Sequence, residues 1–565
     1  MRHSRNWRQT RLGRALPGAA LLRDHRPYVT WLAVALFLTV AAVAYAVEAG
    51  DPGRKSPAKA VPTAPDATGT GEAQDGADSG APGAGVSTPP ATKPVRAPRT
   101  VPAVRNFDAG GGPAWRPGPG TRVVAPGAGS LADESRRLAG ELKVHRSDGP
   151  ARTGDVELRL RPDQGGGPEA YRITNKDGRV TITAPDDAGV FYGTRTLLQA
   201  LRGGALPPGT IDDAPDRAQR GLNLDIARKH FTADWIEARL HEMADLKLNQ
   251  LGLHFSDDQA FRVESDKHPE IVSKEHLTKD EVRHLVKTAA SLHITVVPEI
   301  DSPGHLGAVL DAHPDLQLKN VSGVPVRGAI DIANPRSAKL VDELLTEFEP
   351  LFPGPYWHLG GDEYRALMAT DPEATYPALA AKAKAEYGPK AKVADLTAGW
   401  LNDRADLLKK DGKKLKAWND GFTEGGQVAT PKDREVEYWT GKEINAREPL
   451  PYLEEGRKVV NLNDEYLYYV LGEPNDFTYP TGKRIYEEWT PAVLRGSKPV
   501  PARYSDQILG ARFAVWCDLA DTQTTTQVAK GIQMPLAAMS QKVWDPRKPS
   551  ASWADFKELA ERVRP

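Results

Sequence analysis

Two adjacent carboxylates, Asp362 and Glu363, end a short apolar run in segment 358–364, which reads His-Leu-Gly-Gly-Asp-Glu-Tyr. The run predicts a β-strand, in which neighbouring side chains point to opposite faces. One carboxyl group can then donate a proton while the other holds a reacting group in place, which suits acid/base chemistry. A Gly-Gly-Asp-Glu string is by itself also typical of a solvated turn. The surrounding chain must therefore decide between the two interpretations.

Short apolar segments alternate with long helical segments from residue 220 onward, and eight of them have strand character. This alternation predicts an α/β fold, a (β/α)8 barrel over residues 216–565, with its chemistry at the carboxyl ends of the strands. The predicted strands are Gly221–Ile226, Leu251–Phe255, Ile294–Glu299, Tyr356–Gly360, Leu415–Trp418, Val436–Trp439, Val459–Leu462 and Phe513–Trp516.

Polar and aromatic residues gather at the ends of these predicted strands. Singly, each has an ordinary explanation: tryptophans near strand ends usually pack in a core or rim, and His305 after Pro-Gly fits a turn. Together they predict one site at one end of the barrel. They are Arg220 at the start of the first strand, then Asp257, His305, Asp362, Glu363, Trp418, Trp439, Tyr466, Tyr468, Trp516 and Asp518 in chain order.

A smaller domain is predicted over residues 106–215. Val156–Leu160, Tyr171–Ile173 and Val180–Ile182 alternate apolar and polar residues, and the last two flank a turn at 175–178. Ala188–Leu201 has apolar residues at helical spacing. We therefore expect a small α+β domain ahead of the barrel.

The first hundred residues predict a membrane-proximal arrangement. A basic segment, 1–27, precedes an uncharged apolar run, 28–47, of about the length that spans a bilayer. We expect a cytoplasmic basic segment and an uncleaved transmembrane anchor, and a cleaved signal peptide ending near Ala44-Tyr45-Ala46 is the alternative. Residues 48–105 are rich in Pro, Ala and Gly and predict a disordered linker. The folded part would then be extracellular, at the membrane face or secreted.

The composition argues against several classes of protein. The 565 residues carry a formal net charge of −1, and no basic, aromatic-interleaved patch indicates nucleic acid. Cys517 is the only cysteine, so no intrachain disulfide forms and no cysteine-based zinc spacing exists. His254, Asp257 and Asp258 are potential metal ligands, but they lack the supporting His or Cys set of a known metal motif. We expect no metal and no other cofactor.

The segment around Asp362 and Glu363, with the other strand-end residues, resembles glycoside hydrolase family 20, the β-N-acetylhexosaminidases. The resemblance covers the whole barrel, is nearest the dispersin B and lacto-N-biosidase subgroup, and extends weakly to the small domain. It implies substrate-assisted catalysis, in which the 2-acetamido group of the sugar attacks C1. The resemblance also implies that N-acetylhexosamine-containing glycans are the substrates.

The resemblance assigns a role to each site residue. Glu363 becomes the general acid/base, Asp362 orients the acetamido nitrogen and stabilises an oxazolinium intermediate, and Tyr466 binds the acetamido oxygen. Asp257 and His305 would form a relay with Glu363. Arg220 would hold sugar hydroxyls, and Trp418, Trp439 and Trp516 would wall the pocket. An apolar pocket and the charge of Asp362 would raise the pKa of Glu363. We leave Glu299 out of the site as a loop brace.

Tyr468 and Asp518 depart from the commonest family pattern, which has Asp and Glu at these places. Both positions contact the far hydroxyls of the terminal sugar in the family, so substrate identity stays open. The leading interpretation is a retaining β-N-acetylhexosaminidase that removes terminal β-linked GlcNAc or GalNAc. The alternatives are a lacto-N-biosidase that releases a disaccharide and a catalytically dead, membrane-tethered glycan-binding protein.

Overall fold

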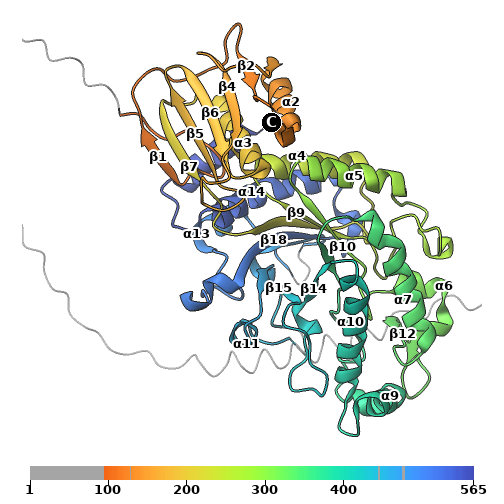
Figure 1. Cartoon of the computed structure of the whole chain (residues 1–565). Helices are drawn as coiled ribbons and strands as arrows, with labels where there is room; N and C mark the ends of the chain where they lie inside the picture. Colours follow the sequence, from red (N-terminus) through yellow and green to blue (C-terminus); the bar gives the residue numbers. More distant parts are fainter. Residues whose placement is uncertain (1–93, 128, 443–445, 474–476, 565) are drawn as a thin grey trace, which may run out of the picture. The chain divides into compact units, whose positions relative to one another are not determined.

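The computed structural model describes residues 94–127, 129–442, 446–473 and 477–564. Figure 1 shows a mixed β-sheet domain, drawn in orange and yellow, followed by a barrel of strands surrounded by helices. Among the described residues, no helix is long and apolar enough to cross a membrane. The predicted membrane segment 28–47 lies outside the described residues, as do residues 48–93 of the predicted linker.

The barrel is closed by parallel pairing throughout. β16 and β8 both pair with β18, which completes the ring. An extra strand, β17 (Tyr468–Val470), pairs with the carboxyl half of β18. Every predicted strand corresponds to an observed one. The ring consists of β8 (Gln219–Asp225), β9 (Gln250–His254), β10 (Thr295–Glu299), β13 (Tyr356–His358), β14 (Lys414–Trp418), β15 (Glu435–Tyr438), β16 (Val459–Asn461) and β18 (Ile508–Trp516).

Amphipathic helices cover the barrel strands, which are buried on both faces and therefore read as apolar runs. In α5 (Lys279–Ser291), for example, Val282, Leu285 and Ala289 share one face and are buried, and a capping box joins Thr278 and Glu281 at its start. The other helices of this domain are α4 (Ala233–Asp245), α6 (Gly307–Ala312), α7 (Pro335–Phe348), α8 (Pro372–Thr375), α9 (Pro377–Tyr387), α10 (Val393–Lys409), α11 (Pro449–Glu454), α12 (Asp464–Leu467), α13 (Gly482–Glu488), α14 (Thr525–Trp544) and α15 (Trp553–Val563). A small hairpin joins β11 (Gln317–Lys319) to β12 (Pro325–Ile330).

The preceding domain is a seven-stranded mixed sheet in the order β1-β7-β5-β6-β4-β2-β3. The predicted turn joins β5 to β6, with Lys176 opposite Arg179. Helix α3 lies close to the sheet because Gly193 has no side chain, and a Cβ there would come 2.5 Å from Ile182. The strands are β1 (Asn106–Ala109), β2 (Arg122–Val124), β3 (His145–Ser147), β4 (Val156–Leu160), β5 (Tyr171–Lys176), β6 (Arg179–Ala184) and β7 (Gly209–Asp213), with helices α2 (Ala132–Leu142) and α3 (Asp187–Arg202).

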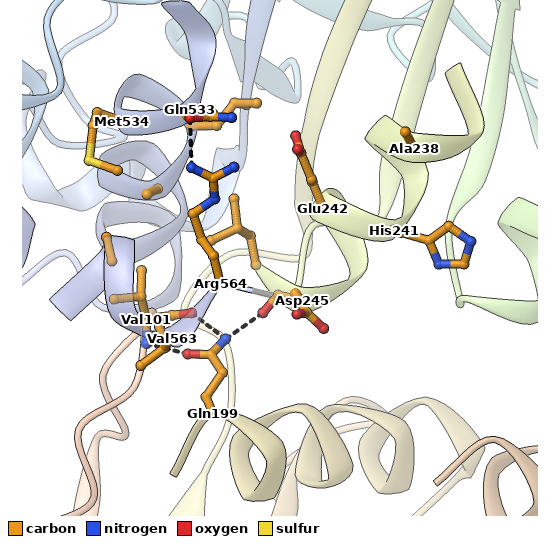
Figure 2. A pocket seen from close by; sticks show the side chains of 14 residues that line it. Val101, Gln199, Ala238, His241, Glu242, Asp245, Gln533, Met534, Val563 and Arg564 are labelled. Atoms are coloured by element: carbon orange, nitrogen blue, oxygen red, sulfur yellow. Dashed lines mark hydrogen bonds between the residues drawn. The ribbon is translucent and has the colours of Figure 1, made fainter. Parts of the chain in front are cut away.

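The predicted linker extends too far, because its last residues belong to the folded part. Val101 is 1% exposed, and its backbone N–H donates to Gln199 Oε1 at 2.7 Å. Gln199 Nε2 donates in turn to the carbonyls of Val101 and Asp245, as Figure 2 shows. These residues border an apolar cavity of about 340 Å³ between α4, α14 and α15. Burial and hydrogen bonds thus fix this segment to both the small domain and the barrel.

Arg220 lies where the two domains meet, and its predicted role as a sugar contact is wrong. Its guanidinium donates to both carboxylate oxygens of Glu169, at 2.8 and 2.9 Å, and it lies over the rings of Tyr192 and Trp544. Arg220 stands at the amino end of β8, whereas the site lies beyond Asp225 at the carboxyl end. That separation is about 17 Å at the usual strand rise. Arg220 therefore forms a buried ion pair with Glu169 that has a structural role.

Candidate active site

A cavity of about 380 Å³ opens at the carboxyl ends of the barrel strands. Most of the predicted site residues line it, although they come from loops far apart in the sequence. Parallel strands bring these loops together because all their carboxyl ends meet at one end of the barrel. The lining residues are Arg228, His254, His305, Asp362, Glu363, Trp439, Thr440, Lys442, Asp464, Tyr468, Val470, Phe477, Trp516 and Asp518.

The loop after β13 turns sharply to present both carboxylates to this cavity. Gly360 and Gly361 have φ of +69° and +96°, and Glu363 itself has φ of +46°. A Cβ at position 360 would overlap the carboxylate of Asp301, so only glycine fits there. A positive φ is unfavourable for glutamate and is found mostly where function requires it. The turn explains why two sequence neighbours can serve one cavity.

His305 bridges the carboxylates. Its Nε2 lies 3.4 Å from Glu363 Oε2 and 3.6 Å from Asp362 Oδ2, while its Nδ1 lies 3.3 Å from Asp257 Oδ1. Asp257 also accepts from His254 Nε2 at 2.8 Å and pairs with Arg228 Nη2 at 2.8 Å. Contacts therefore run continuously from Asp257 through His305 to Glu363, as the predicted relay requires.

Charge along this relay decides where the proton lies. Burial would lower the pKa of His305, but the charges of Asp257 and Asp362 hold it well above the usual value. Burial raises the pKa of Asp257, and the charges of His305 and Arg228 outweigh it and hold the pKa well below the usual range. Asp257 is thus ionised and keeps His305 protonated.

The pKa of Glu363 is lowered, chiefly because His305 donates a hydrogen bond to its carboxylate. The expectation of a raised pKa is therefore wrong for the ligand-free protein. Pairing with an imidazolium outweighs the burial that we expected to dominate. In this state the proton available to Glu363 resides on His305.

Two further buried carboxyl groups, which the predicted site did not include, contact the dyad. Asp301 hydrogen-bonds Asp362 and accepts the backbone N–H of Gly361 at 2.8 Å. Asp420 accepts the backbone N–H of Glu363 at 2.9 Å and Trp439 Nε1 at 3.1 Å. Burial and the charge of Asp362 raise the pKa of Asp301 well above its usual value and that of Asp420 to about 8. Asp420 therefore holds its proton at neutral pH, and burial favours the protonated form of Asp301.

Burial and ion pairing oppose each other at Asp362, and on balance its pKa is raised. Burial raises the pKa of Asp362 as well, but the opposing charge of His305 and the hydrogen bond from Asp301 favour its ionised form. In its ionised form, Asp362 can accept a hydrogen bond from an N–H in the cavity. It can also stabilise a positive charge that develops beside it.

Aromatic rings form one wall of the cavity. Trp439 and Tyr468 stack with centroids 5.7 Å apart and planes inclined by 5°, and Tyr468 lies 5.9 Å from Trp516. Trp418 is not a lining residue: it supports Trp516 from behind, and its Nε1 donates to Glu299 at 2.6 Å. Glu299 also contacts His254 and His358 and is itself 1% exposed, in keeping with a bracing role. Flat apolar faces of this kind suit a sugar ring.

Family models match the two domains in order. The catalytic domain of glycosyl hydrolase family 20 matches residues 218–547, more than half of the chain, and domain 2 of that family matches residues 97–214. The chain belongs to glycoside hydrolase family 20. It is accordingly a glycoside hydrolase, built on the family's barrel with the family's preceding domain.

Several relatives within family 20 resemble this chain. It is 32% identical to a lacto-N-biosidase of Bifidobacterium bifidum over 84% of its own length, although it spans only 42% of that protein. It is 29% identical to a β-N-acetylhexosaminidase of Cellulomonas fimi, with 75% of this chain and 84% of the relative covered. The solved β-N-acetylhexosaminidase of Streptomyces coelicolor A3(2) matches at a TM-score of 0.67 and 24% identity, covering 83% of this chain and 96% of that one. That last likeness bears on the fold.

Within this family 20 enzyme, the cavity receives Tyr468 and not Tyr466. Tyr466 belongs to the short helix α12, where its hydroxyl faces Glu488 and Arg484 lies over its ring. Tyr468 begins β17, which pairs with the end of β18 and directs this side chain into the cavity. The prediction for Tyr466 is wrong because the chain changes from helix to strand between two tyrosines.

Arg228 takes the place that we had predicted for Arg220. It follows β8, lines the cavity, and pairs with Asp225 at 3.1 Å and Asp257 at 2.8 Å. Asp518 lines the same region, where burial raises its pKa against the opposing charge of Arg228. The sequence contains a signal that favours Arg228 as the site residue. Arg228 follows the carboxyl end of the first predicted strand, whereas Arg220 precedes that strand.

Proposed function

We propose that this enzyme is a retaining β-N-acetylhexosaminidase that removes terminal β-linked GlcNAc or GalNAc by substrate-assisted catalysis. The observation that carries the proposal is the meeting of Asp362 and Glu363 at one cavity, with His305 within 3.6 Å of both. A two-carboxylate retaining mechanism would place its groups on opposite sides of the scissile bond. Adjacent carboxylates on one loop suit an acid beside a group that orients an internal nucleophile.

Proton delivery would begin on His305. In the ligand-free protein, His305 and Glu363 form an ion pair beside the cavity. A bound sugar would displace water, and a desolvated ion pair is less favourable than a neutral pair. The proton would then move from His305 Nε2 to Glu363 and on to the leaving oxygen, and Glu363 would afterwards accept a proton from the attacking water.

The acetamido group would act as nucleophile, with its carbonyl oxygen bonding to C1 as the glycosidic bond breaks. Ionised Asp362 would accept the acetamido N–H and stabilise the oxazolinium ion that results. Tyr468 lines the cavity and would donate to the acetamido oxygen, and the rings of Trp439 and Trp516 would exclude water. An internal nucleophile needs positioning more than activation.

A thiazoline analogue of the N-acetyl sugar tests this mechanism, because it copies the cyclised intermediate. We expect strong competitive inhibition, no turnover of the matching β-glucoside, and turnover of a chromogenic N-acetylglucosaminide. Efficient hydrolysis of the plain glucoside would refute substrate assistance. Binding of N-acetylglucosamine with no turnover of either glycoside would favour a catalytically dead glycan-binding protein.

A second candidate is a lacto-N-biosidase that releases a disaccharide. It is supported by the 32% identity to the Bifidobacterium enzyme over 84% of this chain. Asp518 also supports it, since a side chain one methylene shorter than glutamate leaves more room at the far side of the cavity. Comparison of a chromogenic lacto-N-bioside with the matching N-acetylglucosaminide distinguishes the two activities.

We further propose that the enzyme acts outside the cell, at the membrane face through an anchor at residues 28–47 or as a secreted protein. The basic segment before this apolar run supports the orientation. Fractionation of cells that express the full chain tests the proposal. Activity in washed membranes that is released by protease added to intact cells supports anchoring, activity in the medium supports secretion, and activity confined to the cytosol would refute both.

A further inference from the structure

Two histidines and a glutamate meet on the outside of the barrel, away from the active-site cavity. His268 Nδ1 lies 3.1 Å from Glu270 Oε1, and His313 Nε2 lies 3.0 Å from the same oxygen. The imidazole rings are 6.2 Å apart and nearly perpendicular, at 83°. One ligand atom from each residue lies within 4.8 Å of the others, which is close enough to share one metal ion.

The atom types and spacings suit zinc. Zinc in proteins binds histidine nitrogen and carboxylate oxygen at about 2.0–2.1 Å in a tetrahedral arrangement, which puts neighbouring ligand atoms about 3.3 Å apart. The two observed nitrogen–oxygen separations, 3.0 and 3.1 Å, need to open only slightly to reach this value. Water would supply the fourth ligand.

The second ring nitrogen of His268 gives an independent reason to expect a metal ion here. His268 Nε2 is buried without a hydrogen bond, yet it lies 3.5 Å from a carboxylate oxygen of Glu343 on α7. A neutral imidazole has a single N–H and cannot donate to Glu270 and Glu343 together. With a metal on Nδ1, the proton sits on Nε2 and faces Glu343, which is the usual arrangement of a carboxylate behind a metal-bound histidine.

We propose that His268, Glu270 and His313 bind one zinc ion, with Glu343 as the carboxylate that orients His268. The site would join two loops that carry catalytic groups. His268 lies in the loop that follows β9 and contains Asp257, and His313 ends the helix α6, which begins just after His305. None of the three ligands lines the active-site cavity. The ion would therefore stabilise the loops and take no part in the chemistry.

Zinc titration of the metal-free full chain tests the proposal. After chelation and removal of the chelator, we expect one zinc per chain at micromolar free zinc and a Tm that rises by about 2 °C or more with zinc, because binding to the folded state alone adds stability. Turnover at low temperature should persist without zinc. Cobalt(II) in place of zinc should give the visible absorption of a four-coordinate site. No zinc bound by the wild-type chain would overturn the proposal.

A matched pair of variants locates the site. His313→Gln should lose the bound zinc and the rise in Tm while keeping turnover. His284→Gln removes another surface histidine that pairs with a glutamate, Glu237, at 2.9 Å. His241 lies 3.9 Å from the same glutamate, but among the described residues these three do not form a group whose ligand atoms are close enough to share one ion. This variant should therefore keep both the bound zinc and the rise in Tm. Glu270→Gln provides a second test if His313→Gln fails to fold. Zinc binding that survives both ligand variants, or that is lost equally in His284→Gln, would place the ion elsewhere and refute the assignment.

Discussion

The arginines near the two ends of β8 have different roles. At the amino end, Arg220 is fully buried and gives its donors to Glu169, Tyr192 and backbone carbonyls. At the carboxyl end, Arg228 pairs with Asp225 and Asp257 yet still lines the cavity. The first arginine holds two domains together and the second faces the substrate side. Whether an arginine stabilises the fold or faces the active site therefore depends on its position along a barrel strand more than on its residue type.

The largest effect is expected at the carboxyl end, from Glu363→Gln. Substrates with poor leaving groups depend most on proton donation, so their hydrolysis should fall by about 10²–10⁴-fold. Activated aryl glycosides should lose less, and Tm should stay near that of the wild type. The ratio of kcat for the two substrate types is the measurement. Near-wild-type turnover of a natural disaccharide would remove Glu363 from its role.

The two arginines should differ in what their substitution affects. Arg228→Lys should lower kcat/KM by about 10–100-fold, because lysine cannot reproduce two directed pairs, and it should change Tm little. Arg220→Met should leave kcat/KM of the folded fraction intact and lower the free energy of unfolding by about 3–5 kcal/mol, since Glu169 would lose its buried partner. Steady-state kinetics and thermal unfolding on both variants provide the measurement. A large loss of kcat/KM with unchanged Tm in Arg220→Met would reverse the assignment.

Strand positions could be predicted from the sequence because barrel strands are short apolar runs with polar residues directly after them. Asp257, His305, Asp362 and Glu363 were found for that reason. Asp301 and Asp420 were missed as site residues because their importance comes from contacts across strands, with Asp362 and with the backbone of Glu363. The ionisation of Glu363 was misjudged for a similar reason, since it depends on how closely His305 approaches.

Activity should respond to pH through His305. Its pKa is raised, so it stays protonated through neutral pH and loses its proton only in the alkaline range, where kcat/KM should fall. In His305→Gln, Glu363 must hold the proton alone, and a carboxyl group loses it at lower pH. The alkaline limb of the profile should therefore move toward acidic pH, with activity at neutral pH falling more than at low pH. A limb that stays in place would show that another group governs it.

Tyr468 and Tyr466 should also differ, because only the first lines the cavity. Tyr468→Phe removes a hydroxyl from the cavity and should lower kcat by about tenfold, whereas Tyr466→Phe should leave kcat within about twofold of the wild type. Both variants keep the ring, so packing is matched. Kinetics on an N-acetylglucosaminide decides the case, and a larger loss in Tyr466→Phe would restore the prediction made from the sequence.

The smallest effect is expected from Asp518→Glu, a change at the edge of the same end of the barrel. The added methylene should bring the carboxylate nearer a terminal sugar and fill room that a disaccharide would need. If Asp518 keeps that room open, activity on a lacto-N-bioside should fall relative to a simple N-acetylglucosaminide by about fivefold, or about 1 kcal/mol in relative specificity. Asp518→Asn provides the control, because it keeps the length and removes the charge beside Arg228, so it should lower both activities together. Should the wild type hydrolyse no lacto-N-bioside, and should Asp518→Glu reduce only monosaccharide release, Asp518 would be a hydroxyl contact of a plain β-N-acetylhexosaminidase.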